Sequence, residues 1–172
     1  MSAEANPQLA LRPMLPGEAP LLEEILCASI VELTQDDYEV EQQEAWIAEA
    51  NNGVPFADAL AKQTTIVATM SGSPVGFASL ESDEKIGMLY VHPAAVERGV
   101  GTLLADALEK IAAGRGAKDL SVDASDSAFD FFNKRGYAAQ QRNSVRCGNE
   151  WVSNTTMNKT LPGPETVQGA TF

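Results

Sequence analysis

The segment VHPAAVERGVGTLLADALEKI, residues 91–111, decides the fold prediction for this chain. Residues 88–91 read as a strand, and residues 101–113 carry an apolar stripe at three- and four-residue spacing, which indicates an amphipathic helix. Gly99 and Gly101 lie at the junction, although glycine is a poor former of either element. Glycines let a backbone approach a ligand closely and adopt positive φ. Because the first amides of a helix lack intrahelical acceptors and carry the positive end of its dipole, the junction predicts a phosphate cradle.

Two well-known phosphate-binding motifs do not fit this junction. The third glycine of the dinucleotide-binding fingerprint would fall at Leu104, and no Gly-Lys-Thr or Gly-Lys-Ser follows, as a Walker A loop requires. Two glycines by themselves also permit a simpler interpretation, in which they only allow the chain to turn. The rest of the sequence therefore has to distinguish a cradle from a turn.

The remaining sequence predicts a mixed sheet with helices on its faces. Apolar periodicity and turn residues predict these elements in order: a strand at 9–12, a helix of about 16 residues from Glu18, helices at 39–50 and 56–61, strands at 65–70, 75–80 and 86–91, the 101–113 helix, a strand at 119–122, a helix at 125–134 capped by Ser125 or Asp126, and strands at 138–146 and 151–159. We expect one domain over residues 1–160, followed by a tail at 161–172 whose Pro, Gly and Thr content predicts disorder.

Composition limits the function classes. The formal net charge of −12 disfavours nucleic acid binding, because phosphates are repelled over most of the surface. No apolar run approaches the ~20 residues that a membrane span needs, and residues 1–8 lack the features of a signal peptide. Cys27, Cys147 and the single His92 predict neither a disulfide framework nor a metal site. We therefore expect a cytoplasmic protein with reduced thiols, no membrane partner and no metal.

Two motifs resemble those of the GNAT superfamily of acyl-CoA-dependent N-acetyltransferases, and the resemblance covers residues 9–160. Residues 88–102 contain Met-Leu-Tyr-Val-His-Pro and then Glu-Arg-Gly-Val-Gly-Thr, which is similar to the family signature (Gln/Arg)-x-x-Gly-x-Gly/Ala. Residues 128–137, Ala-Phe-Asp-Phe-Phe-Asn-Lys-Arg-Gly-Tyr, resemble the family's Ala-x-x-Phe-Tyr-x-Lys-x-Gly-Phe. Both motifs in the right order make the resemblance specific. Residues 151–157, together with Tyr38 and Trp46 upstream, resemble one bacterial subgroup of single-domain members.

The resemblance implies a fold and a cofactor. The fold would be α/β (α+β), a mixed, mainly antiparallel twisted sheet of about seven strands flanked by about four helices, with a splay between the fourth and fifth strands. The cofactor would be acetyl-CoA, with its pyrophosphate on the loop amides and its pantetheine paired to the preceding strand. The residues carried over for cofactor binding are Leu89, Tyr90, Val91, Val96, Glu97, Arg98, Gly99, Val100, Gly101, Thr102, Ser125 and Phe132.

Three positions depart from the family pattern and leave the catalytic groups open. Val96 occupies the place of a Gln or Arg, so a side-chain contact to phosphate is missing. Phe132 occupies the place of the usual tyrosine, often the general acid. Gly87 lies in the strand that often supplies a carboxylate base.

Acetyl transfer to an amine makes demands that few residues here can meet. A lysine-like amine is almost entirely protonated at neutral pH, a penalty of roughly 4.6 kcal/mol unless a base or an apolar pocket helps. A backbone N–H at 89–91 is placed to stabilise the oxyanion, worth about 3 kcal/mol if preorganised. We expect Tyr38 as the proton donor and Asp123 as the base, with Tyr38 and Trp46 in the acceptor pocket. Transfer is expected to be direct, without an acetyl-enzyme.

The sequence leaves more than one function open. The first is an N-acetyltransferase that acts on a small primary amine. The second is a CoA-binding sensor or partner-binding module that kept the cradle and lost catalysis, and protein acetylation lies between the two. The last predicted hairpin, 138–159, is a candidate surface for a homodimer.

Overall fold

The computed structural model describes residues 8–51 and 54–163, and the chain there alternates between a single sheet and covering helices. The strands are β1 (Leu9–Pro13), β2 (Thr64–Met70), β3 (Ser73–Ser82), β4 (Lys85–Val91), β5 (Asp119–Ser125), β6 (Ala138–Cys147) and β7 (Glu150–Thr160). The α-helices in this part are α1 (Ala19–Leu33), α2 (Val40–Glu49), α3 (Phe56–Lys62), α4 (Val100–Gly114) and α5 (Phe129–Lys134), with a 3-10 turn η1 (Pro93–Ala95). The expected element order is confirmed.

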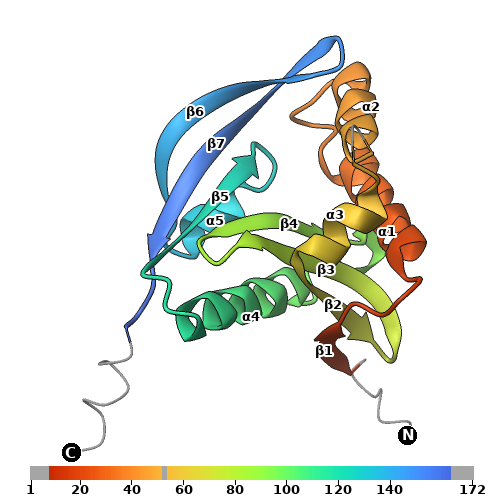
Figure 1. Ribbon diagram of the computed structural model, residues 1–172. Helices are drawn as coiled ribbons and strands as arrows, with labels where there is room; N and C mark the ends of the chain where they lie inside the picture. Colours follow the sequence, from red (N-terminus) through yellow and green to blue (C-terminus); the bar gives the residue numbers. More distant parts are fainter. Residues whose placement is uncertain (1–7, 52–53, 164–172) are drawn as a thin grey trace, which may run out of the picture.

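The sheet has the order β1-β2-β3-β4-β5-β7-β6 (Figure 1). Every neighbouring pair is antiparallel except β4 and β5, which run parallel. That parallel pairing comprises only Lys85 opposite Ser121 and Ile86 opposite Val122. Beyond Ile86 the two strands separate. The seven-stranded mixed sheet and the splay between its fourth and fifth strands are therefore confirmed.

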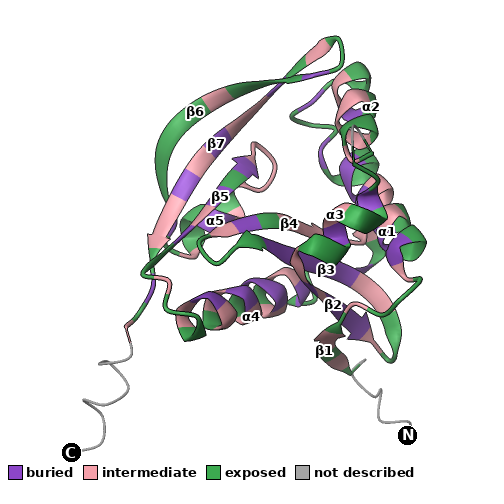
Figure 2. Cartoon of the chain, viewed as in Figure 1, coloured by how far each residue is buried: buried purple, intermediate pink, exposed green. Residues whose placement is uncertain are grey.

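Helices cover both faces of the sheet. The apolar stripe of α4, with Val100, Leu104 and Leu108 fully buried, packs on β3 and β4. On the opposite face, α1 and α3 bury Leu22 and Leu60 against the sheet. Figure 2 shows the buried stripe along α4 and the exposed side that faces solvent. The three- and four-residue spacing seen in the sequence is what places one side of each helix in the core.

The last two strands form a long hairpin that contacts α2 at its tip. Most of β6 is exposed, and Figure 2 shows this strand largely in the colour of exposed residues. Tyr38, Cys147 and Val152 form a small buried cluster there, against Trp46. Segments distant in the sequence are thus brought together beside the separated edges of β4 and β5.

The structure differs from the sequence prediction most clearly at the β5–α5 junction and at the start of the predicted tail. Strand β5 continues to Ser125, and α5 begins only at Phe129, because residues between them form a turn in which the Ala128 N–H donates to the carbonyl and side-chain oxygens of Ser125. The sequence places Leu161 at the start of the predicted tail, but in the structure Leu161 is buried and its N–H donates to the Lys118 carbonyl at 2.8 Å. Residues 164–172 lie outside the described residues. Within the described chain, no helix has the length and apolarity to cross a bilayer.

Candidate active site

The glycine loop joins β4 to α4 through a left-handed turn. Gly99 is the N-cap of α4 at φ 84°, and Glu97 also has a positive φ of 63°. The first hydrogen bond of the helix runs from the Leu103 N–H to the Gly99 carbonyl at 3.0 Å. The amides of the first helical turn, from Val100 to Thr102, therefore have no intrahelical acceptor, and among the described residues no side chain caps this end. The loop has the geometry that anion binding requires.

A close approach between β3 and α4 sets the position of this loop. A Cβ atom added at Gly76 would lie 3.0 Å from the Tyr90 carbonyl oxygen and 3.0 Å from Cγ1 of Val100. The absence of a side chain at Gly76 lets the N-terminus of α4 lie directly on the sheet. The 3-10 turn before the loop is held by His92, whose N–H donates to the Val75 carbonyl and whose Nδ1 accepts from the Ala94 N–H. His92 thus has a structural role in the turn.

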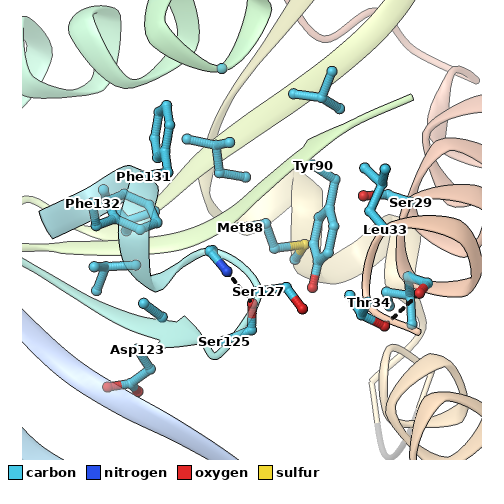
Figure 3. A pocket seen from close by; sticks show the side chains of 18 of the residues that line it. Ser29, Leu33, Thr34, Met88, Tyr90, Asp123, Ser125, Ser127, Phe131 and Phe132 are labelled. Atoms are coloured by element: carbon cyan, nitrogen blue, oxygen red, sulfur yellow. Dashed lines mark hydrogen bonds between the residues drawn. The ribbon is translucent and has the colours of Figure 1, made fainter. Parts of the chain in front are cut away.

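A cavity of about 330 Å³ opens where β4 and β5 separate. Its walls come from α1, the Trp46 position of α2, β4, the end of β5, the following turn and α5. A smaller cavity of about 250 Å³ lies at the glycine loop and shares Val91, Val96, Gly101 and Phe131 with the larger one. The two adjoin along β4. In Figure 3 the side chains of Phe131 and Phe132 lie on one side of β4, and those of Ser29, Leu33 and Thr34 on the other.

The cofactor-binding residues expected from the sequence gather around these two cavities. The larger one is lined by Leu89, Tyr90, Val91, Val96, Gly101, Ser125 and Phe132. The adjoining one adds Glu97, Gly99, Val100 and Thr102. Arg98 is exposed and lines neither. The structure therefore brings together two segments that are separated in the chain, the glycine loop with its strand and the β5–α5 region.

Tyr38 lies outside the larger cavity. Its side chain is buried, and burial is the main reason that the pKa of its phenol is raised. The hydroxyl donates to the Ser153 carbonyl at 2.6 Å and accepts from the Asp126 N–H at 2.8 Å. Both bonds are to backbone groups, so this hydroxyl ties β7 to the turn after β5. The placement favours a positioning role over the proton-donor role expected from the sequence.

Asp123 does line the larger cavity, but each of its oxygens has a partner. The Thr156 hydroxyl donates to Oδ1 at 2.6 Å, and Nζ of Lys85 lies 3.3 Å from Oδ2. Burial by itself lowers the pKa of the Lys85 ammonium, but the hydrogen bonds and charges of Asp123 and Glu81 together outweigh burial and raise the pKa. The carboxylate side chain remains 38% exposed and can still accept from a water or substrate.

Tyr90 is a phenol of the cavity wall that the sequence prediction assigned only to cofactor binding. Its ring lies 5.7 Å from Phe77 and 6.5 Å from Trp46, centroid to centroid. Burial raises the pKa of Tyr90 to about 12, against a smaller opposing effect of the Trp46 indole. Tyr90 is therefore protonated at neutral pH and can act as a hydrogen-bond donor. Figure 3 shows its hydroxyl pointing away from β4 towards the region of Ser127.

Gly87 lacks the carboxylate that many family members place on this strand, and the structure shows what occupies the space. A Cβ added there would lie 2.5 Å from Oε1 of Gln63 and 3.0 Å from the Ser79 hydroxyl. Ser79 donates to Gln63 at 2.6 Å, which holds that amide in place. A side chain at position 87 would have to displace Gln63.

Other cavity residues could not be identified from the sequence. Ser29 and Leu33 belong to α1, whose apolar stripe indicated only core packing. Phe131 lies within the second motif, but the sequence did not indicate which of its aromatic residues faces the loop. Its ring would lie 3.4 Å from a Cβ added at Gly101. The turn after β5 contributes Ser127, whose hydroxyl donates to Asp37 at 2.7 Å.

Comparison with known proteins gives the family. Residues 34–161 match the family model described as the acetyltransferase (GNAT) domain. The uncharacterized N-acetyltransferase YafP of Escherichia coli strain K12 is 30% identical over 151 residues, which cover 87% of this chain and 94% of YafP. The chain therefore belongs to the GNAT family of N-acetyltransferases.

Solved structures agree with this assignment. A GCN5-related N-acetyltransferase from Rhodopseudomonas palustris is 54% identical, with a TM-score of 0.86 and coverage of 94% of this chain and 99% of that one. The PaiA N-acetyltransferase of Thermoplasma acidophilum in complex with coenzyme A has a TM-score of 0.75 at 19% identity, covering 89% and 99%. YncA of Salmonella typhimurium, solved with acetyl-CoA, has a TM-score of 0.61 at 18% identity, covering 90% and 94%. These last two show the same fold.

Proposed function

We propose that this protein transfers the acetyl group of acetyl-CoA to a primary amine of a small molecule, directly and within a ternary complex. The observation that carries the proposal is the junction of β4 with α4. The strand edge beyond Ile86 has no β5 partner, and it leads into helix amides that have no intrahelical acceptor. An extended pantetheine chain ending in a diphosphate matches these two features in order. PaiA and YncA, which share the fold, are described with coenzyme A and acetyl-CoA.

The chain's own groups can support each part of the transfer. The apolar wall of the cavity favours the neutral form of the attacking amine, since desolvation lowers the pKa of an ammonium group. Asp123, acting through water, is the proposed acceptor of the amine proton. Unpaired N–H groups of the β4 edge would stabilise the oxyanion while the new C–N bond forms and the C–S bond breaks. Tyr90 takes the place of Tyr38 as the proposed donor of a proton to the leaving thiolate.

The experiment that tests this function measures cofactor binding and transfer separately. Calorimetry with coenzyme A reports the cradle, and release of free thiol from acetyl-CoA in the presence of a panel of primary amines reports transfer. We expect binding of coenzyme A and thiol release that depends on the amine. Intact mass after mixing with acetyl-CoA alone should show no acetylated protein, and a trapped acetyl-enzyme would contradict direct transfer.

Val96, Gly87 and Phe132 favour a second candidate, a CoA-binding module without catalysis. These are the positions that lack the polar groups found in many family members. Tight binding of coenzyme A with no thiol release across the panel would establish this alternative. Failure to bind coenzyme A would overturn both functions.

A homodimer built on the β6–β7 hairpin stays a prediction. Val145 and Trp151 on this hairpin are 42% and 55% exposed, and they offer apolar surface that a second copy could bury. Light scattering coupled to size-exclusion chromatography would measure the mass in solution. If the hairpin is the interface, Trp151→Ser should shift a dimer to the monomer mass.

A further inference from the structure

We propose that the acceptor is a monoamine with a compact apolar body, best an aromatic one, and without a carboxylate or phosphate. The inference rests on the proposed function, because it concerns the side of the same cavity that faces α1 and α2. We call this side, formed by Ser29, Leu33, Trp46, Met88 and Tyr90, the acceptor side. In the view of Figure 3, Tyr90 lies between Met88 and the α1 residues Ser29 and Leu33.

The walls of the acceptor side are apolar and held in place. Trp46 lies between two phenol rings, 5.4 Å from Tyr38 in an edge arrangement and 6.5 Å from Tyr90. Tyr38 cannot move freely, because both of its hydrogen bonds are to backbone groups. A fixed indole and phenol, with Leu33 and Met88 beside them, form a surface suited to a flat apolar group.

Ser29 provides a polar group that has no other role. The residue is only 7% exposed and lines the cavity, and its hydroxyl makes no hydrogen bond to any other described residue. No fully buried side-chain oxygen or nitrogen of the described residues lacks a partner, so the Ser29 oxygen is open to the cavity and can form a hydrogen bond with a ligand there. The neighbouring Thr34 is not available, because its hydroxyl donates to the Ile30 carbonyl and accepts from Gln43.

The charges around the cavity exclude an anionic acceptor. Asp123 is the only charged side chain among the described residues that line it. The nearby cations already face carboxylates, Lys85 with Asp123 and Arg142 with Asp126. Asp37, bound to the cavity hydroxyl of Ser127, has no cationic partner in the described chain. A carboxylate on the acceptor would be desolvated without a cation, which is costly.

The same surface disfavours a diamine. A second ammonium group would lie against Leu33, Trp46 and Met88, whose side chains offer it no carboxylate or carbonyl oxygen as a hydrogen-bond acceptor. A single amine, in contrast, is drawn in by the surrounding negative charge and loses its proton in the apolar cavity before it reacts. These arguments together favour an acceptor that has a single amine group and is otherwise uncharged.

Binding of the acceptor can be measured without catalysis, because Trp46 is one of only two tryptophans. In a Trp151→Phe background with coenzyme A bound, the fluorescence of Trp46 reports occupancy of the acceptor side. The probes are phenethylamine, phenylalanine, phenylalanine methyl ester and diaminobutane. We expect phenethylamine and the ester to bind at least about ten-fold more tightly than phenylalanine or diaminobutane, and thiol release from acetyl-CoA to follow the same order.

A pair of substitutions on α1 tests the charge argument. Leu33→Arg places a cation in the acceptor side, and we expect it to reverse the preference between phenethylamine and phenylalanine. Val31→Arg is the matched control, because Val31 is exposed on the same helix and does not line this cavity. Val31→Arg should leave the order unchanged.

The outcomes of these measurements test the proposed acceptor class and the proposed transfer reaction separately. Binding of phenylalanine or diaminobutane as tight as that of phenethylamine would overturn the acceptor class and leave the transferase intact. A Trp46 response to phenethylamine without thiol release from any amine would support the acceptor side and overturn the transfer reaction. No response to phenethylamine, with thiol release from an anionic acceptor or a polyamine, would also overturn the acceptor class. No response and no release with any probe would overturn both.

Discussion

The side-chain hydroxyl of Tyr38 accepts a hydrogen bond from the backbone N–H of Asp126 at 2.8 Å, across 88 residues of sequence. The same hydroxyl donates a hydrogen bond to the Ser153 carbonyl at 2.6 Å. One buried hydroxyl thereby fixes the turn that presents Ser125 and Ser127 to the cavity. A residue in such a position influences catalysis through the groups that it holds.

Tyr38→Phe separates positioning from proton donation. The loss of both bonds should lower the free energy of unfolding by about 1–3 kcal/mol, because buried backbone groups lose their partner. Steady-state kinetics should show a higher KM with a pH profile of kcat like that of the unchanged protein. A fall in kcat of about 10²–10⁴ with loss of one limb of the profile would instead identify Tyr38 as the acid. Tyr137→Phe, at a buried phenol outside the cavity, is the matched control.

Gly101→Val tests the cradle. The added side chain would meet the Phe131 ring and Cγ2 of Val91, where the two cavities adjoin. We expect the dissociation constant for coenzyme A, measured by calorimetry, to rise at least about ten-fold. Gly114→Val, at the other end of α4, adds a Cβ that meets nothing within 4 Å and should leave binding unchanged. Equal binding by the two variants would show that the diphosphate is held elsewhere.

Gly87 and Gln63 should be energetically coupled. Gly87→Ala places a methyl group against the Gln63 amide and breaks its bond with Ser79, which we expect to cost about 1–2 kcal/mol of stability. Gln63→Ala removes the obstruction, so the double variant should be more stable than the sum of the two single changes predicts. Denaturant unfolding of all four proteins measures the coupling. Strict additivity would mean that the two residues do not compete for the space.

Glu109 of α4 is bound to Lys159 of β7 and to Arg135 and Tyr137 just after α5, and its ionisation is expected to make the stability depend on pH. Burial acts to raise the pKa of this carboxyl, but hydrogen bonds from Lys159, Arg135 and Tyr137 outweigh burial and lower the pKa below the ordinary value of a glutamate. A carboxyl with a lowered folded pKa contributes stability that is fully present above its unfolded pKa of about 4.3 and is lost as the pH falls through the folded value.

Glu109→Gln should therefore be less stable than the unchanged protein at neutral pH, by about 1–3 kcal/mol. The difference should shrink as the pH falls below about 4. Thermal unfolding followed across this range measures it. Glu24→Gln, at an exposed carboxylate of α1, should show no such convergence, and a constant difference for Glu109→Gln would mean that its ionisation is not linked to folding.

Much of the fold could be predicted from local patterns. The α4 stripe and the glycine junction lie within residues 91–111, where periodicity and conformational preference act over a few residues. The end of β5 could not be predicted in the same way. Residues 123–125 continue the strand because they pair with Thr156, Thr155 and Asn154 of β7. The helix-capping residue types in this segment predicted that the helix would begin earlier.

The features of the candidate site also fall into two groups, those that local sequence determines and those that long-range contacts determine. The sequence by itself determined the strand, the left-handed glycine turn and the exposed amides after it, because these depend on neighbours within a few residues. Only the tertiary structure decided that Ser29 and Leu33 of α1 face the cavity, that the Tyr38 hydroxyl is bonded to backbone, and that Gln63 occupies the space beside Gly87. Each of these depends on contacts between segments far apart in the chain, and no local pattern carries that information.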